Sequence, residues 1–148
     1  MIEIQPLSPG DQTALEMAGR VSAFLGEARA TLDLALYDVR LPGESGDLVA
    51  GALRDAAARG VQVRIAYNAD HDERVFPPPP RTSPELLEQL PFPTRGIPGI
   101  PDLMHHKYVV RDGEAVWTGS MNWTLDSWTL QENVIATVTE PAVAVAYA

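Results

Sequence analysis

The sequence predicts an α/β domain with a mixed, largely parallel sheet flanked by helices on both faces. In the first half of the chain, segments with the two-residue alternation of strands follow segments of helical periodicity. The strand, helix and strand expected within residues 31–67 have a crossover of the length that joins parallel, right-handed neighbours. A length of 148 residues suits a single domain with a buried core.

Four elements are expected in this first half. Apolar side chains recur at helical spacing over residues 11–30, and leucines alternate along a strand at residues 31–39. A second helix turns its apolar side inward over residues 48–56. A second strand with alternating apolar residues follows at 61–67, which completes the parallel pair.

Proline then interrupts the pattern, since nine of the thirteen prolines fall within residues 76–101. We expect residues 70–104 to form a Pro-rich loop with at most a short helix at 83–90. Such a long connection is usually functional, and this one leads directly into His105, so it is predicted to form part of the wall of a site. A stiff polyproline spacer on the surface is the alternative. Asp70-His71-Asp72 is interpreted as a polar loop rather than a metal site.

A β-hairpin is expected next. Alternate side chains of extended chain share a face, so His105 and Lys107 point the same way and His106 points opposite. Asp112-Gly113 is a strong two-residue hairpin signal. The return strand delivers residues 119–122 to the end of the sheet where the hairpin began. Imidazole, ammonium, hydroxyl and carboxamide groups are therefore predicted to converge there.

The last part of the chain predicts three short elements. Residues 123–130 can hold a turn of helix, and residues 131–138 have the pattern of another strand. Residues 140–148 look like the first turns of a helix without a C-terminal cap. We expect the chain to be a domain or fragment of a longer protein.

Composition narrows the class of function. The formal net charge is −9 and no basic run is present, so the chain has no general attraction for nucleic acid or for an anionic membrane. It contains no cysteine, and thus neither disulfides nor thiolate metal sites. No signal peptide or transmembrane run is visible in the sequence, which predicts a cytoplasmic or membrane-peripheral protein.

The converging groups suit a phosphodiester. A neutral imidazole can attack phosphorus and divide one difficult displacement into two easier steps. An ammonium and neutral donors can hold the non-bridging oxygens, whose charge must be stabilised as the bond breaks. Lys107 is the one lysine beside ten arginines, which suggests that this position needs a compact point charge.

The spacing of these residues resembles a known signature. His105-x-Lys107, four residues, Asp112, six residues and then Gly119-Ser120-x-Asn122 resembles the HKD signature of the phospholipase D superfamily, whose members make and break phosphodiester bonds. The likeness extends over nearly the whole chain. It implies a fold that is one half of a phospholipase D-like protein, with residues 1–148 forming a single domain that carries one signature.

The resemblance also implies roles. His105 would be the nucleophile that forms a phosphohistidine, or the acid that protonates the leaving group. Glu132 stands where the family carries a carboxylate after the Gly-Ser loop and would hold the imidazole in its tautomer; a solvated strand-end carboxylate is the alternative. Asp112 belongs to the catalytic signature, although its position between two strands also suits a turn residue. His106 is expected to pack.

Lys107, Ser120 and Asn122 would bind the phosphate oxygens in this resemblance. Ser120 and Asn122 also suit residues that only stabilise a loop. The family mechanism needs no metal and no cofactor, so none is expected here.

The active site of this family is built from two signatures that face each other, so the one signature of this chain makes half of such a site. The second comes either from a copy of the chain in a homodimer, as in the small single-signature nucleases, or from a second half of a longer chain. Three functions follow: metal-independent hydrolysis or transfer of a phospholipid-type diester, which is favoured; a homodimeric nuclease; and a phosphate-binding or pairing half-domain that is inactive alone.

Overall fold

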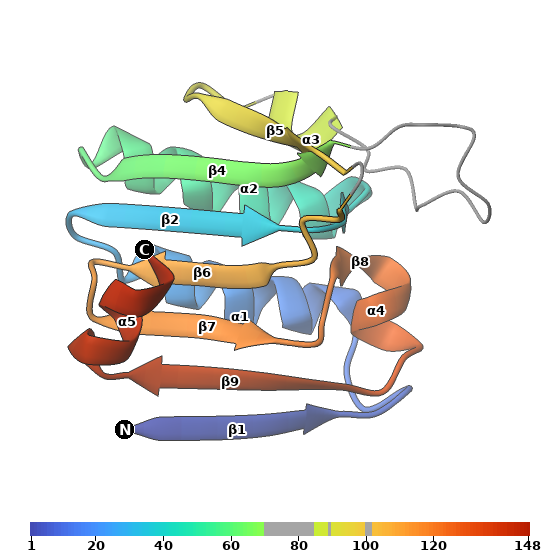
Figure 1. The fold of residues 1–148 in the computed structure, drawn as a ribbon. Helices are drawn as coiled ribbons and strands as arrows, with labels where there is room; N and C mark the ends of the chain where they lie inside the picture. Colours follow the sequence, from blue (N-terminus) through green and yellow to red (C-terminus); the bar gives the residue numbers. More distant parts are fainter. Residues whose placement is uncertain (70–84, 89, 100–101) are drawn as a thin grey trace.

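The computed structural model describes residues 1–69, 85–88, 90–99 and 102–148. Its centre is a seven-stranded sheet in the order β1-β9-β7-β6-β2-β4-β5 (Figure 1). Helices α1 (Ala14–Gly26) and α2 (Gly43–Ala58) cover one face, and α5 (Pro141–Tyr147) lies on the other. The predicted α/β class, with a mixed sheet and helices on both faces, is confirmed.

The remaining elements are short. The strands of the sheet are β1 (Ile2–Leu7), β2 (Thr31–Leu36), β4 (Gln62–Ala69), β5 (Thr94–Pro98), β6 (Lys107–Arg111), β7 (Ala115–Gly119) and β9 (Asn133–Thr139). Outside it are β3 (Val39–Arg40), which pairs with β8 (Trp123–Thr124), and the helices α3 (Glu85–Glu88) and α4 (Leu125–Thr129).

The parallel pairings are confined to one side of the sheet. Strand β2 runs parallel to β4, as predicted, and β4 runs parallel to β5. The pairings from β2 through β6, β7 and β9 to β1 are antiparallel. The sheet is mixed because β2, β4 and β5 are parallel neighbours, while the β6–β7 hairpin and the strands β9 and β1 add antiparallel pairings.

The main core lies between the sheet and helices α1 and α2. Leu32, Leu34 and Leu36 share the face that packs on these helices, and all three are buried, as their alternation predicts. Helix α1 begins with a capping box in which Thr13 and Glu16 each accept from the other's backbone N–H. No helix in the described part of the chain is long and apolar enough to cross a membrane.

Two edge strands were not predicted. Strand β5 lies within the stretch assigned to the Pro-rich loop, and that assignment is corrected at residues 94–98. Gly96 and Pro98 are atypical of a strand, so the sequence pattern does not indicate one here. An edge strand tolerates a proline because the backbone N–H groups on its outer side have no neighbouring strand to bond. Strand β1, at the opposite edge, has only one buried residue to reveal its alternation. Residues 70–84, including Asp70-His71-Asp72, lie outside the described residues.

Asp112 anchors the hairpin at the end of the sheet far from His105. Asp112 and Gly113 have φ values of 57° and 65°, which confirms the tight turn between β6 and β7. The Asp112 carboxylate accepts hydrogen bonds of 2.7–3.2 Å from the backbone N–H groups of Arg29, Ala30 and Thr31. Burial raises the pKa of Asp112, but these donors outweigh burial and leave the pKa lowered.

This geometry predicts that Asp112→Ala destabilises the fold by about 1–3 kcal/mol at pH 7, because three backbone N–H groups lose their charged acceptor. A lowered folded-state pKa gives stability that is present above the unfolded pKa of about 3.9 and lost as pH falls through the folded value. The deficit of the variant should therefore shrink below about pH 3.9. Urea unfolding at several pH values measures it. Glu114→Ala, an exposed change in the same turn, is the control and should cost less than about 0.5 kcal/mol.

Candidate active site

One end of the sheet, here called the site edge, gathers the predicted chemistry. At this edge β2 and β7 finish while β6 and β9 begin (Figure 1). The β6–β7 register ends on Tyr108 opposite Thr118, so Lys107 and Gly119 reach the edge together. The residues predicted for the site that lie at this edge are His105, Lys107, Ser120, Asn122 and Glu132. Asp112 lies at the other end of β6.

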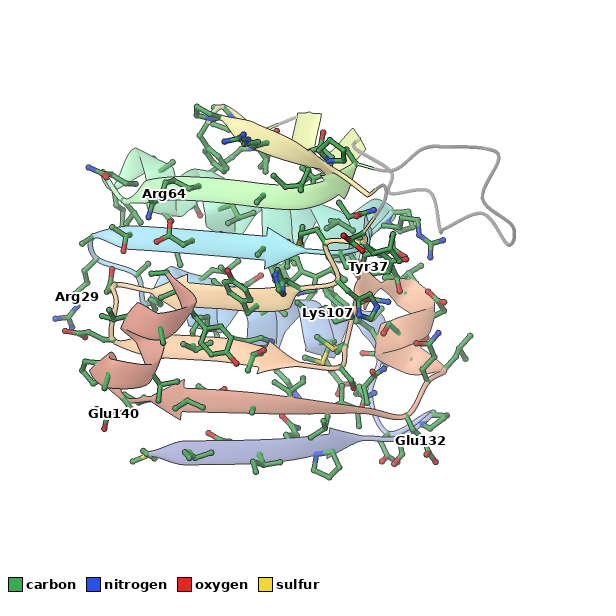
Figure 2. The ribbon with its side chains drawn as sticks, viewed as in Figure 1. Arg29, Tyr37, Arg64, Lys107, Glu132 and Glu140 are labelled. Carbon is green, nitrogen blue, oxygen red and sulfur yellow. The ribbon has the colours of Figure 1, made fainter. Side chains whose placement is uncertain are left out.

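Tyr37 contacts both His105 and Lys107. Its ring lies 4.5 Å from the imidazole of His105, centroid to centroid, in an edge-on arrangement. The Nζ atom of Lys107 lies 4.8 Å from the centre of the same ring and donates a 3.0 Å hydrogen bond to the carbonyl of His105. Figure 2 shows Tyr37 and Lys107 together near the site edge. His105 and Lys107 therefore lie together at the site edge, as the alternation of an extended chain predicts.

The charges at the site edge favour a neutral imidazole. The pKa of His105 is lowered, first by partial burial and then by the positive charge of Lys107 and by His106. Burial also lowers the pKa of Lys107, while the nearby Asp38 carboxylate opposes that shift. The site therefore holds a neutral nitrogen base beside a cation, which is the pairing that attack on a phosphate needs.

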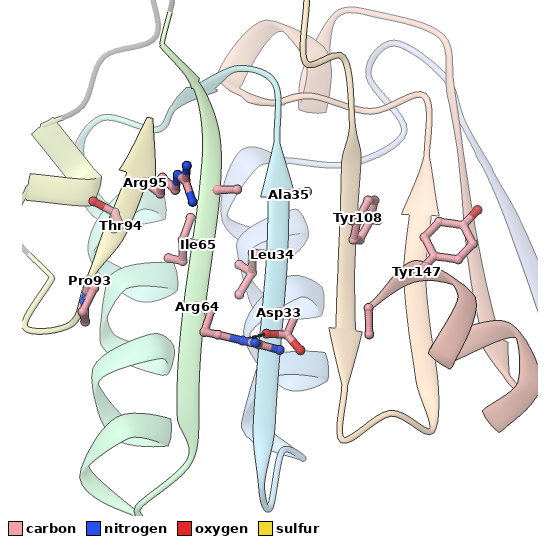
Figure 3. A pocket seen from close by; sticks show the side chains of 12 residues that line it. Asp33, Leu34, Ala35, Arg64, Ile65, Pro93, Thr94, Arg95, Tyr108 and Tyr147 are labelled. Atoms are coloured by element: carbon pink, nitrogen blue, oxygen red, sulfur yellow. Dashed lines mark hydrogen bonds and ion pairs between the residues drawn. The ribbon is translucent and has the colours of Figure 1, made fainter. Parts of the chain in front are cut away.

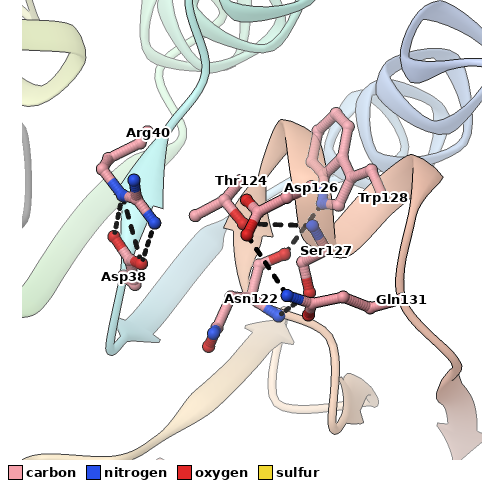
Figure 4. Close-up of polar contacts among 8 residues, drawn as sticks. All are labelled: Asp38, Arg40, Asn122, Thr124, Asp126, Ser127, Trp128 and Gln131. Carbon is pink, nitrogen blue, oxygen red and sulfur yellow. Dashed lines mark hydrogen bonds and ion pairs between the residues drawn. The ribbon is translucent and has the colours of Figure 1, made fainter. Parts of the chain in front are cut away.

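Asp38 is a buried charge that the sequence argument missed. Its side chain is 2% exposed, and its carboxylate accepts bonds of 2.9–3.2 Å from the Arg40 guanidinium (Figure 4). Two neighbouring groups keep this negative charge satisfied: Arg40 by direct contact and Lys107 through its field. An Asp-x-Arg pair at the end of a predicted buried strand was the signal that could have revealed it.

The glycine of the Gly119-Ser120 pair in the signature is required for steric reasons. Gly119 has φ 149°, and a Cβ at this position would lie 2.0 Å from the carbonyl oxygen of Val134. Only glycine lets β7 approach β9 so closely. The Ser120 hydroxyl then accepts from the Val134 N–H at 3.1 Å and donates to the Asn133 Oδ1 at 2.7 Å. Ser120 is thereby fixed in the free protein.

The loop that carries Asn122 is held by α4. The Asn122 N–H donates to the Ser127 hydroxyl at 3.1 Å, and its carbonyl accepts from the Trp128 indole at 2.9 Å (Figure 4). Asn133 donates to Ser127 as well, so one network joins Ser120 to Asn122. In the described part of the chain, the buried Oδ1 of Asn122 has no hydrogen-bond partner. Ser127, Trp128 and Asn133 are supporting residues that no local motif indicated.

Glu132 does not contact His105 in this chain. It is exposed, and among the described residues no hydrogen bond or ion pair joins it to the imidazole. In Figure 2 it lies at the start of β9, apart from Lys107. The neighbouring Asn133, rather than Glu132, bonds the Gly-Ser loop. His106 lies on the other side of β6, with its ring centre 5.6 Å from that of Tyr108.

A separate pocket of about 370 Å³ lies on the α5 face of the sheet. The Arg64–Asp33 ion pair, Arg95 and the tyrosines 108 and 147 line it (Figure 3). None of the predicted site residues lines this pocket. Among the residues with described positions, no group of three or more His, Asp or Glu side chains is placed so that it could hold a metal ion.

The comparisons with known proteins agree with this fold. Residues 21–148 match the family described as "Cardiolipin synthase, PLD-like domain", and the chain belongs to this family within the phospholipase D superfamily. The mitochondrial cardiolipin hydrolase of Chlamydomonas reinhardtii is 26% identical over 122 residues, which cover 80% of this chain and 48% of that protein. The chain spans between 38% and 51% of the length of the curated relatives that it matches.

Two solved structures show the same fold at different lengths. The phospholipase D family member Nuc from Salmonella typhimurium has a TM-score of 0.69 at 23% identity, and the match covers 99% of this chain and 90% of Nuc. The phosphatidylserine synthase of Haemophilus influenzae has a TM-score of 0.67 at 13% identity, covering 99% of this chain and 37% of that one. The domain thus corresponds to nearly the whole of one chain and to a part of the other.

The electrostatics predict that His105 titrates below the ordinary histidine pKa of about 6.5. Lys107→Met should move this pKa upward, because a positive charge that repels the imidazolium is removed. An NMR titration of the three histidines, assigned with His105→Ala, measures both effects. Arg64→Met removes a cation elsewhere and should leave the titration of His105 unchanged. A wild-type value above 6.5, or a downward movement in Lys107→Met, would contradict this account.

Proposed function

We propose that the chain carries half of a phosphodiester-cleaving site in which His105 is the nucleophile. The observation that carries the proposal is the neutral imidazole of His105 held beside the Lys107 ammonium at the site edge. The imidazole nitrogen would form a bond to phosphorus while a bond from phosphorus to oxygen breaks. Water or an alcohol would then displace the histidine, giving hydrolysis or transfer.

Lys107, Ser120 and Asn122 are the groups proposed to bind phosphate. The Lys107 ammonium supplies positive charge where negative charge grows on the non-bridging oxygens. Ser120 and the Asn122 loop are already fixed by Asn133 and Ser127, so they would not have to be ordered when substrate binds. Asp112 anchors the fold at the far end, and we assign it a structural role. Glu132 keeps the proposed role of orienting an imidazole only if a partner brings the two groups together.

The leaving oxygen needs a proton, and the imidazole of His105 is already assigned as the nucleophile. We propose that a second imidazole supplies it, from a second copy of the chain or from a second half of a longer protein. The match to nearly the whole of Nuc supports the first arrangement, and the match to 37% of the phosphatidylserine synthase supports the second.

A phospholipid-type diester is the proposed substrate class. The family description and the Chlamydomonas relative are both named for cardiolipin. The net charge of −9 gives a nucleic acid no general attraction. The alternative is a nuclease that acts as a homodimer, which the match to a chain of similar length favours. A pairing half-domain that binds phosphate without turnover is the non-enzymatic alternative.

Hydrolysis of a chromogenic phosphate diester tests the reaction. The chain should cleave it in the presence of chelator, with a rate that rises faster than linearly with protein concentration if two copies complete the site. Because the neutral imidazole is the active form, the rate should fall as pH drops through the lowered pKa of His105. His105→Ala should lose at least about a hundredfold in rate.

The control for this test is His106→Ala, which removes an adjacent histidine that points away from the site. It should keep the activity of the wild type. Short-chain phospholipid should compete with the chromogenic diester better than a DNA oligonucleotide does at physiological salt. Equal losses in both histidine variants would contradict the assignment of His105, and stronger competition by DNA would favour the nuclease.

A further inference from the structure

Tyr37 is a buried aromatic residue that also contacts two groups at the site edge. It is 7% exposed, yet it belongs to neither of the apolar clusters that form the core of the described residues. Its ring contacts His105 at one side and lies beneath Lys107. We propose that Tyr37 is a positioning residue, whose ring holds the His105 imidazole and the Lys107 ammonium in a fixed relation to each other. The proposal rests on the proposed function of these two groups.

The backbone around Tyr37 is rigid enough for this role. Its N–H donates a 2.7 Å hydrogen bond to the carbonyl of His106, which extends the β2–β6 pairing by one step. The next carbonyl, that of Asp38, accepts from the Trp123 N–H at 3.0 Å. Tyr37 is therefore tied on one side to the histidine segment and on the other to the Asn122 loop. A side chain on such a support keeps one orientation.

The imidazole of His105 depends on this ring for its orientation. Among the described residues, no hydrogen bond reaches either nitrogen of His105, and Tyr37 is the aromatic ring in contact with it. An edge-on contact between two rings is favourable beyond the burial of their area. Both nitrogens are thus left available for chemistry while the ring plane is constrained.

The ammonium of Lys107 depends on the same ring for its charge. Burial disfavours the charged amine, and the Asp38 carboxylate opposes this effect. A cation close to the face of a tyrosine ring is attracted by the negative face of the π system. The hydrogen bond from Nζ to the His105 carbonyl then fixes the direction of the side chain. One ring therefore serves the two groups that must act on the same phosphate.

Substitutions at Tyr37 separate this role from simple packing. Tyr37→Phe keeps the ring and should stay within about threefold of wild-type kcat, whereas Tyr37→Leu and Tyr37→Met remove it and should lose about tenfold to a hundredfold. KM should change less than kcat, because two of the three proposed phosphate ligands, Ser120 and Asn122, are untouched. Tyr108→Leu, which removes an aromatic ring from the opposite face of the adjacent strand, is the matched control and should keep wild-type kcat.

The same variants are read by the NMR titration of His105, which needs no turnover. Loss of the ring exposes the imidazole to water, so its pKa should rise toward the ordinary value in Tyr37→Leu and Tyr37→Met but not in Tyr37→Phe or Tyr108→Leu. His106, Lys107 and Asp38 remain in all four proteins, so the change reports the ring alone. Far-UV circular dichroism identifies variants that fail to fold. If Tyr37→Leu does not fold, Tyr37→Met replaces it as the non-aromatic variant.

Two results would overturn the proposal. One is an unchanged His105 titration in both non-aromatic variants. The other is a loss of kcat in Tyr37→Phe as large as in Tyr37→Leu, which would show that the ring is not what matters. If the wild type cleaves no diester, completion of the site by a second copy of the chain fails, but the titration still decides whether Tyr37 sets the environment of His105.

Discussion

The antiparallel pairing of β2 with β6 is the constraint on which the site depends. It joins the parallel part of the sheet to the hairpin, with Leu36 opposite Lys107. Because the pairing continues through Tyr37 and His106, it puts a buried aromatic ring and the Asp38 carboxylate beside the His105–Lys107 pair. Asp112 secures the far end of the same strand pair through the amides that precede β2. The residues of the signature are thus divided between the site edge and an anchor at the far end of the strand pair.

Electrostatics give this geometry its chemical meaning. A histidine and a lysine side by side disfavour each other's positive charge. The two side chains of this site differ in which of them stays protonated. His105 loses its proton more readily, while Lys107 keeps its charge with help from Asp38 and the Tyr37 ring. The result is a neutral imidazole beside a cation.

Most of the arrangement at the site edge could be predicted from the sequence, because it follows from local patterns of strand and turn residues. Strand alternation brought His105 and Lys107 to one face, and the Asp112-Gly113 turn returned Ser120 and Asn122 to the same edge. The features that it missed come from distant parts of the chain. Strand β5 exists because β4 offers it an edge, and Asp38 is buried because Arg40 and the β3–β8 pair enclose it. Local sequence patterns cannot predict contacts with partners from other parts of the chain.

Trapping the covalent intermediate tests the central claim most directly. The chain is mixed with a phosphate diester, quenched within one turnover, digested under alkaline conditions that preserve phosphohistidine, and analysed by mass spectrometry. The account predicts a phosphoryl adduct on His105 that disappears in His105→Ala and persists in His106→Ala. An adduct on another residue, or steady turnover without any adduct on His105, would contradict it.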